Sequence, residues 1–198
     1  NLLGAEGLLF ALYDDPYLVH DIMEHHVDFI IELLRPVVDK VHIRSFGLPE
    51  DMAYRNASLI SPAMYREFML PPYRRLFAFL RDSEVEHICI DSDGLLDELL
   101  PLFLEAGANA ISPVEIQCGN DPVAIRKKFG RSLVIHGGIN KYELAKERAN
   151  VRLEMERKVP WLLEQGGYFP GLDHTVPYDV PFENFCYYME LKRKMIGA

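Results

Sequence analysis

Val85-Glu86-His87-Ile88-Cys89-Ile90-Asp91-Ser92-Asp93-Gly94 is the stretch of sequence that decides the fold. Side chains along a strand point alternately to its two faces, so His87, Cys89 and Asp91 share one face. Ile88 and Ile90 share the other face. Strands buried between two layers of helices in an open sheet are apolar on both faces. The polar row therefore favours a closed barrel, in which it lines the interior while the isoleucines pack beneath the helices.

The rest of the chain repeats a unit of one strand followed by one helix, which is typical of a parallel sheet. A helix is predicted from about Pro16 to Val38. Strands are predicted at about 41–43, 85–91, 110–116, 133–136 and 168–169. Later helices are predicted to begin at about 62, 95, 121, 143 and 181, and the one that begins at 143 has a possible break near 148–150.

Two architectures have this repeat, a doubly wound open sheet and a (β/α)8 barrel. The polar row favours the α/β class and the TIM barrel. A whole barrel needs about 250 residues, and the chain has 198. We therefore predict a partial barrel with about five βα units. Its open edges would expose unpaired strands, so we expect it to associate with the missing part of the barrel or with another copy of the chain.

Composition and charge narrow the class of partner. The net charge of −9 argues against nucleic acid, because proteins that bind it carry basic patches. Three cysteines without close spacing indicate reduced thiols in a cytoplasmic protein rather than a disulfide framework. No apolar run approaches the roughly 20 residues of a membrane span, and the first residues lack the basic leader of a signal peptide. We therefore expect neither nucleic acid nor a membrane as a partner.

Active sites of parallel α/β folds lie at the carboxyl ends of their strands. Asp91 and Asp93 end the strand quoted above, and their carboxylates are costly to bury without a cation, a proton or a donor. His174 lies in a turn after the last strand, where it can donate a proton or bind a ligand. We interpret Asp91, Asp93 and His174 as candidate catalytic residues. The candidate substrate-binding residues at the same mouth are Glu50, Asp51, Glu115, His136, Gly137 and Gly138.

Five segments, in this order, resemble the C-terminal part of the uroporphyrinogen decarboxylase superfamily. They are Glu50 to Tyr54 with Leu59 to Pro62, Asp91 to Gly94, Ala106 to Ala110, His136 to Ile139, and Gly171 to His174 with Pro181 to Asn184. The resemblance implies a (β/α)8 barrel, of which residues 1–198 would be the C-terminal portion of a single domain. It also implies that the N-terminal strands of the barrel are absent from this sequence.

The superfamily holds two chemistries, and the first hypothesis follows its decarboxylases. These enzymes act on a tetrapyrrole without a metal or an organic cofactor. The resemblance then implies a carboxy-lyase that acts on a tetrapyrrole-type polycarboxylate, as in porphyrin biosynthesis. In this role Asp91 or Asp93 would stabilise positive charge on the substrate, and His174 would bind a carboxylate or move a proton.

The alternative hypothesis follows the related corrinoid and coenzyme M methyltransferases, which use zinc and a corrinoid protein partner. Asp91, Asp93 and His174 occupy the positions that resemble their zinc ligands, where those enzymes have one histidine and two cysteines. Carboxylates and an imidazole would hold a divalent metal in a harder, oxygen-rich site. An acidic mouth suits a bound cation. A third hypothesis is a non-catalytic domain that binds a tetrapyrrole or a partner protein.

Overall fold

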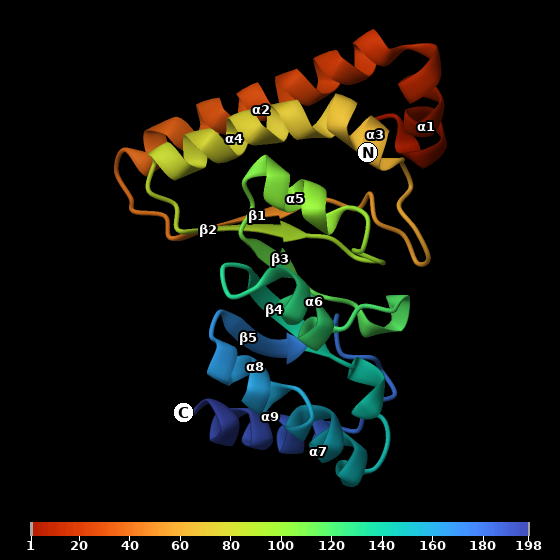
Figure 1. Ribbon diagram of the computed structural model, residues 1–198, viewed down its shortest axis with the longest axis vertical. Coiled ribbons are helices and arrows are strands. Elements are labelled where there is room, and N and C mark those ends of the chain that lie inside the picture. Colours follow the sequence, from red (N-terminus) through yellow and green to blue (C-terminus); the bar gives the residue numbers. More distant parts are fainter. Residues whose placement is uncertain (1, 198) are drawn as a thin grey trace.

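Five parallel strands lie side by side in the order in which they occur in the chain. The computed structural model, which describes residues 2–197, shows them following one another from one end of the molecule to the other (Figure 1). A doubly wound sheet reverses its strand order at a switch point, whereas a barrel adds each strand beside the previous one. The unbroken order therefore confirms the α/β class and the partial barrel. The strands are β1 (Ser45–Pro49), β2 (His87–Asp91), β3 (Ala110–Ser112), β4 (Val134–Ile139) and β5 (Tyr168–Leu172).

The register of the strands explains the polar row in β2. Cys89 pairs with Ala110, and Ala110 pairs with Val134, so these three side chains share one face of the sheet. They form a small buried cluster separate from the main core. Ile88 and Ile90 point the other way and are fully buried in the main core. The predicted division of the two faces of β2 is confirmed.

Helices connect the strands and cover their outer face. The long helix α2 (Pro16–Val38) has the predicted bounds, because Asp15 accepts a hydrogen bond from the Leu18 N–H at 3.2 Å and Pro16 fits the first turn. No helix within residues 2–197 combines the length and the apolar character that crossing a membrane requires. The other helices are α1 (Gly4–Asp14), α3 (Pro62–Met64), a π-helical turn (Tyr65–Met69), α4 (Leu70–Asp82), α5 (Leu100–Ala106), α6 (Pro122–Phe129), α7 (Arg148–Glu156), α8 (Val159–Gln165) and α9 (Phe182–Ile196), with 3-10 turns at Ile116–Cys118 and Lys141–Glu143.

Several predicted elements are corrected by the structure. The first strand lies at Ser45–Pro49 and not at 41–43, because these residues pair with β2. Gly47 and Pro49 interrupt the apolar pattern that marks the other strands, so the sequence pattern does not reveal this one. The helix expected from about 95 begins at Leu100, where Pro101 occupies the first turn. The helix expected from about 143 begins instead as α7 at Arg148, after a 3-10 turn at Lys141–Glu143. A further break lies between α7 and α8, because Pro160 lies in the first turn of a new helix. Helix α1 is a further element that the sequence analysis did not predict.

Candidate active site

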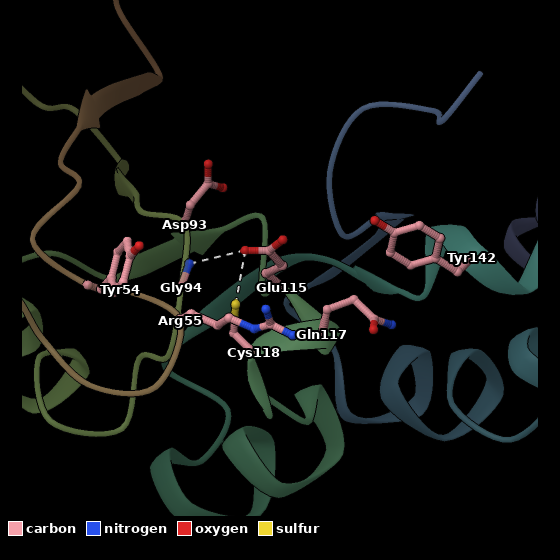
Figure 2. Close-up of a pocket in the computed structure, with 9 residues that line it drawn as sticks. Tyr54, Arg55, Asp93, Gly94, Glu115, Gln117, Cys118 and Tyr142 are labelled. Atoms are coloured by element: carbon pink, nitrogen blue, oxygen red, sulfur yellow. Dashed lines mark hydrogen bonds between the residues drawn. The ribbon is translucent and has the colours of Figure 1, made fainter. Parts of the chain in front are cut away.

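A pocket of about 550 Å³ opens at the carboxyl ends of the strands. The loops that follow β1, β2, β3 and β4 form its walls. Figure 2 shows Glu115 near the middle of the pocket, with Tyr54 and Tyr142 on opposite sides. The residues that line it are Ala53, Tyr54, Arg55, Asp93, Gly94, Glu115, Gln117, Cys118 and Tyr142. The pocket therefore combines carboxylates, two aromatic rings and a guanidinium group.

His174 and Asp93 come from different loops and meet at the edge of this pocket. The Nε2 atom of His174 lies 3.3 Å from Oδ2 of Asp93, and their side chains are 40% and 47% exposed. On the other side of the ring, Nδ1 of His174 lies 2.9 Å from the Oγ1 atom of Thr175. Both ring nitrogens thus have a partner that fixes the orientation of the imidazole. A carboxylate beside an oriented imidazole is suited to proton transfer.

Asp91 and Asp51 place further negative charge beside this pair. Burial raises the pKa of Asp91, and the charges of Asp93 and Asp51 raise it further, whereas His174 lowers it. The structure therefore brings together four of the residues singled out from the sequence: Asp51, Asp91, Asp93 and His174. This concentration of carboxylates favours a nearby proton or cation.

Glu115 joins the loops that follow β2, β3 and β4. Its Oε2 atom accepts hydrogen bonds from the Gly94 N–H at 3.3 Å and the Cys118 thiol at 3.2 Å, and Oε1 lies 3.3 Å from Nζ of Lys141. Burial opposes ionisation of Glu115, but its donors, led by Cys118, outweigh burial and lower the pKa of this carboxyl. Burial and Glu115 in turn raise the pKa of the Cys118 thiol to about 11. Glu115 is thus the charged partner and Cys118 the neutral donor.

Asp173 is fully buried directly before His174. Its Oδ2 atom accepts a hydrogen bond from the Ile116 N–H at 3.0 Å, and its Oδ1 atom accepts one from the Lys141 N–H at 2.9 Å. The carboxylate therefore fastens the loops after β3 and β4 to the end of β5.

Gly94 allows the loop after β2 to press against the loop after β1. Its φ is +88°, a conformation that side chains rarely adopt. A Cβ atom at this position would lie 2.7 Å from the carbonyl oxygen of Tyr54. Only glycine fits here, and its position determines where the preceding residue, Asp93, meets the pocket.

Two residues predicted at the mouth lie elsewhere. The Glu50 side chain is buried and does not line the pocket, and within residues 2–197 neither of its carboxyl oxygens has a hydrogen-bond partner. His136 is an inner-face residue of β4, and its ring lies against Phe169 with 4.6 Å between ring centroids. Burial lowers the pKa of His136, and a positive charge on nearby His87 would lower it further. Neither residue is placed for contact with a molecule bound in the pocket described above.

Gly137 and Gly138 admit close approach, but by the chain itself. A Cβ atom on Gly137 would lie 2.0 Å from the carbonyl oxygen of Pro113, and one on Gly138 would lie 2.7 Å from Cγ of Pro122. The Gly138 N–H also donates to the Pro113 carbonyl oxygen at 3.0 Å. These glycines therefore let β4 pack against the segments that follow β3.

Several residues of the site were not identified from the sequence. Lys141 does not line the pocket, but it is 7% exposed and pairs with Glu115, which does. Arg55 lines the pocket without an ion pair to any residue in the range 2–197. The signal for Lys141 was its position two residues after the end of β4, in the loop region where active sites form. The other residues missed are Tyr54, Gln117, Cys118 and Tyr142.

Comparison with known proteins agrees with this architecture. Residues 2–195 match the family model described as uroporphyrinogen decarboxylase (URO-D). The chain belongs to the URO-D family. Proteins of this family have the TIM-barrel fold, and the unbroken strand order of this chain is part of that barrel.

One curated relative of this URO-D chain is the methylated-thiol–coenzyme M methyltransferase of Methanosarcina mazei. The two are 25% identical over 193 residues, which make up 96% of this chain and 48% of the relative. The chain thus spans about half the length of the curated relative it matches. The superfamily assignment, with its methyltransferases included, is shown by these two matches.

The residues present do not form a zinc site in this arrangement. Within residues 2–197, no group of three or more His, Cys, Asp or Glu side chains is placed to hold a metal ion. Asp93 and His174 stand at the two positions where the related zinc sites have thiolates. Here these two side chains contact each other. The thiol of Cys118, which does line the pocket, stays protonated against Glu115.

Proposed function

We propose that residues 1–198 form the C-terminal portion of a single barrel domain in a URO-D-family methyltransferase. The substrate is a small compound that carries a methyl group on sulfur or oxygen. The observation that carries this proposal is the contact between Asp93 and His174 at the edge of the pocket. The methyltransferase among the relatives supports the same class of reaction.

The charge of the mouth favours methyl transfer over decarboxylation of a polycarboxylate. Asp51, Asp91 and Asp93 gather on one side, and the positive charge of Lys141 is matched by Glu115. Arg55 is then the pocket's cation without a carboxylate partner among residues 2–197. The carboxylates of the mouth would repel a substrate that carries several carboxylates. A substrate with one anionic group could pair with the guanidinium of Arg55.

Methyl removal from sulfur or oxygen needs a proton donor. A reduced corrinoid on a partner protein would supply the nucleophile for the methyl group. As the bond between carbon and the heteroatom breaks, the leaving sulfur or oxygen keeps the electron pair and takes a proton from the protonated imidazole of His174. Asp93 stabilises the positive charge of that imidazole before transfer. Tyr54 and Tyr142, which flank the pocket in Figure 2, hold the apolar part of the substrate.

The proposed reaction is tested by offering the protein methylated thiols and methyl ethers together with reduced cobalamin. The expected result is formation of methylcobalamin, followed by absorbance, and release of the free thiol or alcohol. Uroporphyrinogen is offered in parallel. Its decarboxylation without methyl transfer would establish the carboxy-lyase instead, and tetrapyrrole binding without turnover of any substrate would indicate a non-catalytic domain.

Replacing Arg55 with alanine is expected to raise KM for an anionic substrate about 10-fold or more while changing kcat little. A hydrogen bond to a charged group contributes about 1.5–3 kcal/mol, and Arg55 would make this bond equally in the ground and transition states. Steady-state kinetics at varied substrate concentration measure the effect. The matched control is Arg44→Ala, an exposed arginine at the opposite end of β1 that pairs with Glu86. Equal KM values in both variants would remove Arg55 from substrate binding.

A further inference from the structure

The loops at the mouth are joined in a closed ring of contacts. Asp93 meets His174, which directly follows Asp173 in the chain. The Asp173 carboxylate holds the backbone of Ile116 and Lys141. The Lys141 side chain contacts Glu115, and Glu115 accepts a hydrogen bond from the Gly94 N–H. Gly94 directly follows Asp93 in the chain, so this last contact closes the ring.

Asp173 is the buried member of this ring that lies next to His174 in the chain. Its own N–H donates to the Ile139 carbonyl oxygen at 2.9 Å, so its backbone continues the pairing of β5 with β4. Its two carboxylate oxygens accept from loops that follow β3 and β4. With no exposed surface, the side chain has no access to the pocket. Its only route to the chemistry is through the residues that it holds.

We infer that Asp173 is a positioning residue, whose carboxylate sets His174 against Asp93 by fixing the loops after β3 and β4. This inference rests on the proposed function for its effect on rate. A displaced catalytic group loses rate steeply, since a misplacement of about 1 Å can lower a rate about 100-fold. Asn is nearly isosteric with Asp, but its amide NH2 would face one of the two backbone N–H donors. Asp173→Asn should therefore loosen one loop and shift His174.

The test is a double-mutant cycle between Asp173 and His174. Asp173→Asn is expected to lower kcat about 10- to 100-fold in the parent protein. In a His174→Ala background it is expected to lower kcat less than about 3-fold, because the group that it positions is absent. Equal losses in both backgrounds would overturn the inference, since Asp173 would then act independently of His174.

A second readout does not depend on activity. In NMR spectra the imidazole signals of His174 are expected to move in Asp173→Asn. The matched control is Asp15→Asn, because Asp15 also accepts a backbone hydrogen bond, from the Leu18 N–H at 3.2 Å, but does so at the start of α2 and not in a loop of the mouth. The control should leave the His174 signals and kcat unchanged. Unmoved His174 signals in Asp173→Asn would overturn the inference.

Two further outcomes remain informative. If Asp173→Asn does not fold, Asp173→Glu, which keeps both acceptor oxygens, replaces it in the cycle and in the spectra, with the same criteria. If the protein transfers no methyl group but the His174 signals move in Asp173→Asn alone, the positioning role stands and the proposed reaction fails. The two proposals are therefore separable.

Discussion

Replacing His174 with alanine is expected to lower kcat for methyl transfer about 10²- to 10⁴-fold, the range that a general acid contributes. The imidazole is held at both nitrogens, by Asp93 at 3.3 Å and by Thr175 at 2.9 Å, so its loss removes an oriented proton donor. The rate is measured with substrate in excess, so that weaker binding does not contribute. Asp93→Asn should lower kcat less, because the ring remains while its charged partner is lost.

Chemical rescue distinguishes this role from a structural one. His174 is 40% exposed at the edge of the pocket, so added imidazole can reach the space left in His174→Ala and should restore part of the rate. His25→Ala serves as the control, because His25 is exposed on α2, far along the chain from the mouth. A loss of less than about 3-fold in His174→Ala would contradict the proton-transfer role.

Local signals explain which elements could be predicted from the sequence. Helix α2 is bounded by a capping aspartate and a first-turn proline, both of which are read from neighbouring residues. β1 has no such local signal. Its five residues become a strand through pairing with β2, in which Ser45 lies opposite His87 and Pro49 opposite Asp91. Pairing between distant segments is not encoded in the spacing of one segment.

The misplaced first strand also explains the error at Glu50. With the strand at Ser45–Pro49, Pro49 pairs with Asp91, so the side chain of the next residue turns to the opposite face. That face carries Leu48 and the helix layer and does not open to the pocket. A strand predicted at 41–43 ends too early to indicate which face of the sheet the side chain of residue 50 is on. The face of the sheet was predicted correctly for Asp91, because the bounds of its strand were predicted correctly.

The remaining site residues depend on contacts that a single sequence does not display. Asp91 and Asp93 are recognisable because carboxylates at a strand end are unusual in a packed layer. Lys141 and Arg55 carry charges that are ordinary in loops. Their importance comes from the Glu115 contact and from the pocket wall respectively. The role of Asp173 requires two backbone N–H groups from other loops, which no side-chain pattern reveals.

The buried carboxyl of Glu50 is expected to make the protein less stable as the pH rises. Burial raises the pKa of Glu50 from 4.5 to about 8; the Met52 backbone opposes this rise and Asp51 adds to it. Tyr65 and Tyr73 are buried near Glu50. Burial raises the pKa of both hydroxyls, and a negative charge on Glu50 raises these pKa values further. A charge at Glu50 would therefore face an apolar layer and two neutral hydroxyls.

The direction follows from the two forms of the chain. The unfolded chain releases the Glu50 proton near pH 4.5, whereas the folded chain keeps it until about pH 8. The stability linked to this proton is thus fully present below about pH 4.5 and is lost as the pH rises through about 8. Each pKa unit of difference corresponds to about 1.4 kcal/mol, so the loss amounts to about 3–5 kcal/mol.

Glu50→Gln removes this titration while keeping the shape of the side chain. Its free energy of unfolding, measured in urea between pH 4.5 and 9, should fall less with pH than that of the parent. Above pH 8 the variant should be the more stable protein by a few kcal/mol, because no proton must be retained on folding. Glu32→Gln, at an exposed position of α2, should keep the parent's pH dependence. Parallel curves for the parent and Glu50→Gln would mean that Glu50 is ionised in the folded protein, with a cation or donor beside its two oxygens.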